Sequence, residues 1–205
     1  MSINKNKVIT LLSVPVCLIA AAAHGQSEPQ LNGSLKAIYD IVDSDGDDFG
    51  GSLSLEGTLR LELSPKFELE AGLTGINDAD SDEAEDNTGS YKLTLNSTEL
   101  LLGGTVNLLQ KNQLEVYGRG GLILYKVDVE LEEEFFGLKP GGSASTDDSG
   151  TGFYIGLGGE MKYSPELSII GEIQYRSLLD VLGDSSKPFD VDAISFGVGA
   201  KYYFQ

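Results

Sequence analysis

The chain has 205 residues and a formal net charge of −18, from 14 Lys plus Arg against 32 Asp plus Glu. This charge argues against a nucleic-acid-binding protein, because phosphate binding needs Lys and Arg. The one Cys and the one His, Cys17 and His24, both lie in the first 25 residues. If that segment is removed, the remaining chain has no means to form a disulfide, a Cys/His zinc site, a Cys nucleophile or a Ser-His dyad.

The N-terminal segment, residues 1–25, has the features of a cleaved secretory signal peptide. A start with two lysines is followed by a mostly apolar run over 8–23, and Ala23 and Gly25 supply the small residues of a cleavage site. The alternative is a membrane-anchoring helix, but a proline interrupts this run, which is shorter than the ~20 residues that a spanning helix needs. We expect the exported protein to be a single domain over 26–205.

Beyond this segment, apolar and polar residues alternate along most of the chain, which is typical of strands with one apolar face. The clearest run extends from Leu53 to Leu63, with apolar or small residues at odd positions. The connections are long and short in turn, as in an up-and-down barrel with all its long loops on one rim. We predict an all-β fold of eight antiparallel strands, at 31–40, 53–63, 67–76, 91–109, 114–131, 152–163, 167–178 and 193–204.

Alternation alone does not distinguish two kinds of eight-stranded barrel. A lipocalin-type barrel in water turns its apolar face inward, whereas a membrane barrel turns it outward to lipid. Aromatic residues near the ends of the apolar phase resemble the girdles of membrane barrels. A strand of about eleven residues tilted by about 40° rises roughly 28 Å, which matches the apolar band of an outer membrane. These features favour a transmembrane β-barrel, and a soluble periplasmic carrier is the alternative.

The hairpin over 91–131 carries a further indication. We pair the two strands of this hairpin with Leu95 opposite Val127. On both strands the apolar residues then occupy even positions near the turn and odd positions farther from it. The change falls near Thr98 and Leu124, and we predict that the hairpin leaves the bilayer there. Above this level the apolar residues would line one side of a cup, either as a vestibule for hydrophobic molecules or as packing under the loops. They are Tyr91, Leu93, Leu95, Tyr125, Val127, Val129 and Leu131.

The polar phase of the strands carries charges of both signs. If this phase faces inward, eight acids and six bases form a paired network that closes the narrow lumen of an eight-stranded barrel. The predicted network consists of Lys36, Glu56, Arg60, Glu62, Glu68, Glu70, Glu99, Glu115, Arg119, Glu160, Lys162, Glu172, Arg176 and Lys201.

The four long connections hold 22 of the 32 acids, so the net negative charge belongs to one rim. Two loops space carboxylates at alternate positions, as cation-binding loops do, but neither completes an EF-hand. We therefore predict no cofactor, and keep divalent cations bridging these loops to lipopolysaccharide phosphates as a weaker hypothesis. The weak metal candidates are Asp43, Asp45 and Asp47 in one loop and Asp78, Asp80 and Asp82 in the other.

Over residues 30–205 the chain resembles the small eight-stranded outer-membrane barrels of the OmpA-domain, OmpX and OmpW kind. The alternating C-terminal strand from Ile194 to Phe204 is part of this resemblance, although Gln205 follows the terminal aromatic residue. The resemblance implies recognition of that strand by the outer-membrane insertion machinery, a location in the outer membrane, and contact with its lipid and lipopolysaccharide.

The enzymes among outer-membrane barrels rely on a catalytic His, which residues 26–205 lack. We therefore predict a non-enzymatic protein with acidic extracellular loops, a structural or surface-interaction role and a lumen closed by charged pairs. The alternative is a narrow channel or an OmpW-like barrel that admits small hydrophobic solutes.

Overall fold

The computed structural model describes residues 30–44, 47–81, 84–85, 89–135, 141–183 and 188–204. The predicted signal peptide, Asp45, Asp82 and Gln205 lie outside these residues. Within the described part of the chain, no helix is long and apolar enough to cross a membrane.

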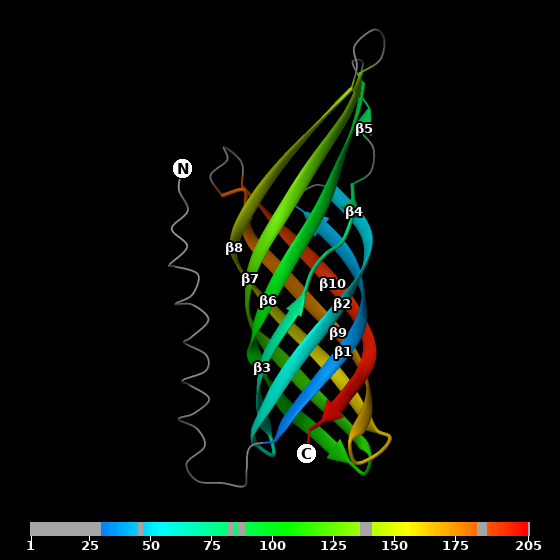
Figure 1. Ribbon diagram of the computed structural model, residues 1–205, viewed down its shortest axis with the longest axis vertical. Helices are drawn as coiled ribbons and strands as arrows, with labels where there is room; N and C mark the ends of the chain where they lie inside the picture. The colour runs from blue at the N-terminus through cyan, green and yellow to red at the C-terminus, as the bar shows by residue number, and fades with distance from the viewer. Residues whose placement is uncertain are drawn as a thin grey trace.

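The described secondary structure consists of strands in a single sheet. Eight long strands follow one another antiparallel in the order β3-β2-β1-β10-β9-β8-β7-β6, and β3 pairs with β6 to close the ring (Figure 1). This confirms the eight-stranded up-and-down fold. The long strands are β1 Leu31–Ser44, β2 Asp47–Ser64, β3 Phe67–Thr74, β6 Gly89–Lys111, β7 Leu114–Phe135, β8 Gly142–Lys162, β9 Leu167–Val181 and β10 Phe189–Tyr203, and the two short strands β4 Ala79–Asp80 and β5 Ala84–Glu85 pair with β6.

Several strands extend farther toward the long loops than predicted. β2 begins at Asp47 instead of 53, and β8 begins at Gly142 instead of 152. These extensions are rich in Gly, Ser and Asp, which lack alternation and are typical of loops. They form strands because the neighbouring strand offers a ladder of backbone hydrogen bonds, which local sequence does not indicate.

The hairpin of β6 and β7 corrects the predicted register by two residues. Leu95 pairs with Val129, not with Val127. The turn lies at Asn112 and Gln113, where Asn112 adopts a φ of 56°, and a bulge follows between Asn107 and Leu109. Because side chains alternate with a period of two, this shift leaves the residues above the bulge on their predicted faces, whereas the bulge itself turns Leu109 to the outer face.

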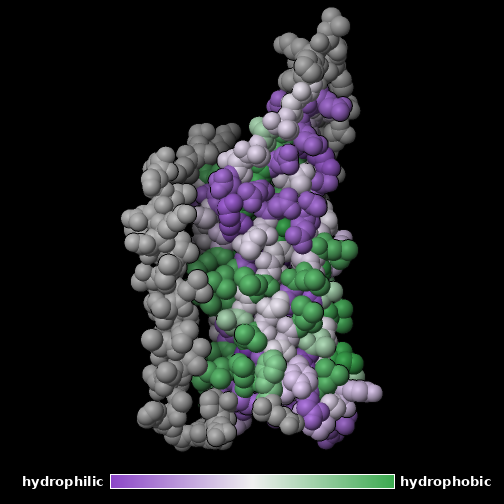
Figure 2. Space-filling model, viewed as in Figure 1, coloured by the Kyte–Doolittle hydropathy of each residue, from purple (hydrophilic) through white to green (hydrophobic). Residues whose placement is uncertain are grey.

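The outer surface changes character at one level of this hairpin. Leu100 and Leu124 pair on the apolar outer face, and the next outward pair is Thr98 with Lys126. The outward residues of the hairpin above this level are polar, while exposed apolar residues on all eight long strands lie below it. Figure 2 shows part of this apolar band on the face in view. Strands β6, β7 and β8 continue past this level, well beyond the rest of the ring (Figure 1). Odd positions of both strands face inward on either side of this level, so there is no bulge here. What changes is the position of the apolar residues, which lie on the outer face below this level and on the inner face above it.

Candidate functional site

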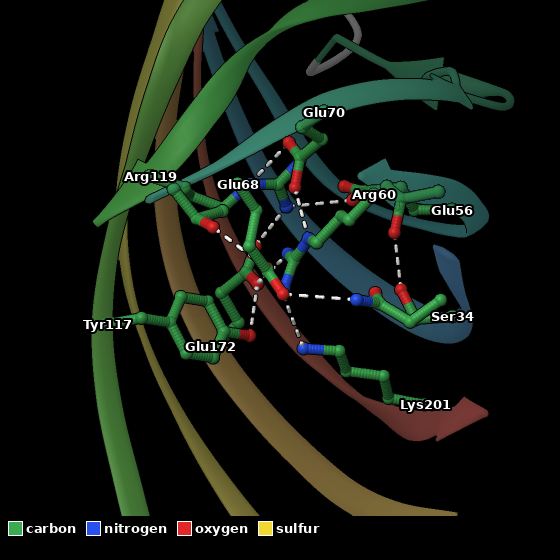
Figure 3. Close-up of polar contacts among 12 residues, drawn as sticks. Ser34, Glu56, Arg60, Glu68, Glu70, Tyr117, Arg119, Glu172 and Lys201 are labelled. Carbon is green, nitrogen blue, oxygen red and sulfur yellow. Dashed lines mark hydrogen bonds and ion pairs between the residues drawn. The ribbon is translucent and has the colours of Figure 1, made fainter. Parts of the chain in front are cut away.

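The centre of the ring is filled by six charged side chains, here called the central tier. They are contributed by β1, β2, β3, β7 and β9, because the polar phase of each strand points inward (Figure 3). None is more than 9 % exposed, and three cations balance three carboxylates. The tier consists of Lys36, Glu56, Arg60, Glu70, Arg119 and Glu172.

Arg119 is the hub of the central tier. Its Nη1 lies 2.7 Å from Glu56 Oε1 and also contacts Glu172, while its Nε donates to Glu70 Oε1 at 3.0 Å. Its guanidinium carbon lies 5.0 Å from the centre of the Tyr154 ring. One side chain thus holds carboxylates from three strands, and this joins opposite walls of the ring.

Lys36 and Arg60 complete the neutralisation of the tier. Lys36 Nζ lies 2.6 Å from Glu56 Oε1 and 2.9 Å from Glu172 Oε1. Arg60 Nε donates to Glu70 Oε2 at 2.6 Å. Each buried carboxylate therefore has at least two cations nearby, which offsets the large desolvation penalty of an isolated buried charge.

A smaller triad lies on the side of the central tier nearer the long loops. Arg176 Nη2 is 2.7 Å from Asp40 Oδ1, and Arg176 Nη1 is 2.6 Å from Glu99 Oε2. Ser54 donates to Asp40, and Ser97 donates to Glu99. The predicted network did not include Asp40, the last residue of the predicted strand 31–40, although it has the same even phase on β1 as Lys36.

A second triad lies toward the short turns. Lys201 Nζ is 3.1 Å from Glu160 Oε2 and 3.4 Å from Glu68 Oε1. Asn32 donates to Glu68, and the Tyr203 hydroxyl donates to Glu160. Both are inward-facing residues that the prediction, which considered only charged side chains, did not include.

Three residues of the predicted network lie apart from these tiers. Glu62 and Glu115 are half-buried, Lys162 is exposed, and all three line a small pocket of about 160 Å³ at the short-turn mouth of the ring. Lys162 lies 5.6 Å from the centre of the Tyr203 ring. The structure thus brings eleven of the fourteen predicted residues into the paired interior, with Asp40 as an addition.

Above the charged tiers the interior is apolar. Of the predicted cup, Leu95, Tyr125, Val127 and Val129 are buried in one hydrophobic cluster, and Leu93 packs against it. This cluster also includes Leu101 and Ile123 of the same hairpin and residues of other strands and connections, so the predicted one-sided lining is packed from the opposite side. Those additional residues are Val42, Phe49, Ile76, Ala79, Leu101, Ile123, Tyr154, Leu178, Val181, Val191 and Ala193. Two predicted residues lie at its margin, with Leu131 half-buried and Tyr91 47 % exposed.

The structure describes the backbone of four of the six metal candidates, Asp43, Asp47, Asp78 and Asp80. Among the described residues, no group of three or more Asp, Glu, His or Cys side chains is arranged to hold a metal ion. Asp43 is exposed on β1, Asp47 begins β2, and Asp78 adopts a φ of 47° in the turn before β4.

Asp80 already has protein partners. Its carboxylate accepts hydrogen bonds from Lys92 Nζ at 2.5 Å and from Thr94 Oγ1 at 2.6 Å. These bonds to the charged form lower the pKa of Asp80 below its ordinary value. These hydrogen bonds join β4 to β6, so the position of the Asp80 carboxylate is explained by its protein partners.

A closed antiparallel ring with an apolar outer band and a polar interior is the architecture of a transmembrane β-barrel. The family model of the outer membrane protein beta-barrel domain matches residues 9–204, and the chain belongs to this family. It is thus an outer-membrane protein, as the resemblance in the sequence implied. No curated protein sequence matches the chain.

Solved structures share the fold at low sequence identity. Neisserial surface protein A (NspA) is 12 % identical with a TM-score of 0.56, and the match covers 85 % of this chain and 97 % of that one. A major outer membrane protein from Thermus thermophilus is 13 % identical with a TM-score of 0.55, covering 87 % and 100 %. OprG from Pseudomonas aeruginosa is 11 % identical with a TM-score of 0.51, covering 88 % and 98 %.

Proposed function

We propose that this protein is a non-enzymatic outer-membrane barrel with a closed lumen, whose role is exerted at the acidic rim formed by its long loops. In outer-membrane barrels the short turns are periplasmic and the longer loops are extracellular. The rim would therefore face the outside of the cell, where a structural or surface-interaction role requires it to be.

Two layers of buried side chains, one charged and one apolar, lie one above the other inside the ring, and this observation supports a closed lumen. The central tier crosses the ring through Arg119, which contacts Glu56 on β2, Glu70 on β3 and Glu172 on β9. Above it lies the hydrophobic cluster, in which Leu95, Leu101 and other inward side chains are fully buried. An ion would have to break buried ion pairs and then cross an apolar layer, which is unfavourable at both steps.

The same contacts support a non-enzymatic role. A general acid or base must reach a substrate proton. Glu70 and Glu172 are each held by cations and are almost fully buried. The purified, folded barrel is expected to leave lipid A and phospholipid unchanged, and turnover of either would contradict this part of the proposal.

Planar-bilayer conductance tests the closed lumen. The folded protein is expected to give no steady openings. The variant Arg119→Ala combined with Glu70→Ala, which empties the centre of the ring, should conduct more than the wild type. Steady openings of the wild-type barrel would refute the closed lumen and favour the narrow-channel alternative.

The second alternative, admission of small hydrophobic solutes, requires a path through the hydrophobic cluster. Liposomes containing the barrel are expected to take up a hydrophobic dye no faster than empty liposomes. Uptake that the barrel accelerates, and that Leu93→Asp with Val129→Asp abolishes, would favour this alternative over the closed lumen.

A further inference from the structure

Among the residues that the structure describes, one edge of the projecting sheet has no strand paired with it. From Gly142 to Thr151, β8 pairs with β7 on one side, and its pairing with β9 begins only at Gly152, opposite Leu178. On the far side of this three-stranded projection, β4 and β5 cover the edge of β6. The projection above the ring therefore has one protected edge and one open edge, formed by β8 (Figure 1).

The ladder at the base of β8 identifies which backbone groups are open. Lys162 N donates to Gln113 O on the β7 side, and Tyr163 N donates to Leu167 O on the β9 side. Successive residues of an antiparallel strand direct these groups to opposite sides, and no bulge interrupts the β7–β8 register. Odd residues of β8 therefore direct their N–H and C=O groups to the open edge.

Local contacts close the lower part of this edge. Asp148 Oδ1 accepts from Ser149 N at 2.7 Å, and its Oδ2 accepts from Gly183 N at 3.2 Å. Farther up, Ser143, Ser145 and Asp147 have no such contact to their open backbone groups from any described residue. These three residues are exposed. The unpaired stretch is therefore long enough for several hydrogen bonds to an incoming strand.

The outer face beside this edge is acidic. Glu132, Glu130 and Asp128 on β7 lie opposite Ser143, Ser145 and Asp147 on β8, and all are exposed.

The nearby cations leave most of this charge unbalanced. Lys126 lies 3.5 Å from Asp128 and 3.6 Å from Asp147. Lys92 is the register partner of Glu132, but its ammonium contacts Asp80. Glu130 and Glu132 have no salt-bridge partner among the described residues.

We propose that this edge binds an extended peptide segment carrying Lys or Arg at alternate positions, which adds to β8 as a further strand. Neighbouring strands lie about 4.8 Å apart, so a peptide strand beside β8 would lie roughly 10 Å from β7. A Lys or Arg side chain on its outer face can cover that distance to Glu130 or Glu132, because the intervening Ser143 and Ser145 are small. Backbone hydrogen bonds would supply affinity and the charges would supply selectivity, as in other strand-addition sites.

The same charges disfavour a second copy of this chain as the occupant. Pairing of two β8 edges would join two acidic surfaces, each with Asp147 on its edge strand, and would bring no cation to Glu130 or Glu132, because residues 142–151 contain no Lys or Arg. Like charges opposite one another destabilise a pair of strands. This inference rests on the proposed function in one respect, that the acidic rim is the exposed working surface.

The test uses the full barrel in lipid nanodiscs and a fluorescent ten-residue peptide of alternating Lys and Thr, followed by anisotropy at low ionic strength. The barrel is expected to bind this peptide and to reject its Glu-Thr counterpart. N-methylation of alternate peptide amides should weaken binding about tenfold, because it removes the backbone donors on one edge. On binding, the amides of Ser145 and Asp147 should become protected from hydrogen exchange.

Matched variants separate strand addition from charge attraction alone. Ser145→Pro removes an open backbone donor on an edge strand, where proline is tolerated, and should weaken binding about tenfold, whereas Ser145→Ala should leave it unchanged. Glu130→Gln with Glu132→Gln should weaken the Lys peptide without disturbing the edge. Heat-modifiable gel mobility checks that each variant is folded.

Equal binding of the Lys peptide by Ser145→Pro and Ser145→Ala, or equal binding of both peptide charges, would overturn the proposal. So would a barrel that dimerises through β8 and ignores the peptide. Each of these failures would leave the closed lumen intact if the bilayer conductance stays at zero, so the two proposals fail independently.

Discussion

Loss of the Arg119 guanidinium should destabilise the barrel more than any other single change to its interior charges. Arg119→Met keeps an unbranched side chain but removes the cation that contacts Glu56, Glu70 and Glu172. The central tier would change from three cations and three carboxylates to two and three. Breaking a buried pair by removing one partner costs about 3–5 kcal/mol, because an uncompensated charge stays buried.

Equilibrium urea unfolding of the barrel in lipid vesicles measures this loss. Adding Glu70→Gln to Arg119→Met removes the surplus charge and should restore part of the stability, by about 1–3 kcal/mol in a double-mutant cycle. Lys126→Met is the matched control on the same strand, since Lys126 is 58 % exposed where it pairs with Asp128, and should cost less than about 1 kcal/mol. A loss below about 1 kcal/mol for Arg119→Met, or strictly additive effects, would refute the reasoning about the central tier.

Three further outcomes are expected. Leu122→Arg, at an apolar position 64 % exposed on the outer face, should lower the free energy of unfolding in vesicles by roughly 2–4 kcal/mol. Glu130→Arg, above the predicted bilayer level, should lower it by at most about 1 kcal/mol. Equal losses for the two variants would contradict the predicted membrane level. Leu95→Ala, in the hydrophobic cluster, should cost about 2–5 kcal/mol in the same assay, unless the cluster is an open vestibule, when the loss would be small. The pKa of Asp80 is lowered in the folded protein, so its bond to Lys92 stabilises the β4–β6 contact fully above the ordinary pKa of Asp. This stabilisation is lost as the pH falls through the lowered pKa. Hydrogen exchange of the β4 amides should therefore be less protected in acid, and this pH dependence should vanish in Asp80→Asn.

The β6–β7 hairpin shows which features alternation can predict and which it cannot. The alternating pattern predicted the correct face for the residues above the bulge at Asn107 and Leu109, because a strand exposes successive side chains to opposite sides whatever its partner. It also placed the change at Thr98, where the outer face becomes polar. The register was wrong by two residues, because the position of the turn at Asn112 depends on backbone geometry that the apolar pattern does not encode.

The sequence by itself thus determined the presence of eight strands, their apolar and polar faces, the level at which the outer face of one hairpin becomes polar, and most of the charges available to the interior. Which charges meet was decided only by the tertiary structure. Arg119 contacts Glu70 and Glu56, which are 49 and 63 positions away in the chain. Closure of the ring sets the stagger between strands, and this stagger decides which inward residues share a level.

Asp40 and the open edge of β8 illustrate the same dependence. Asp40 ends the predicted strand, yet β1 continues past it to Ser44, so its carboxylate lies inside the ring beside Arg176. The edge at Ser145 exists because β8 is longer than β9, and a strand becomes an edge only where its neighbour ends. Local alternation specifies a face, whereas neighbours and edges are properties of the assembled sheet.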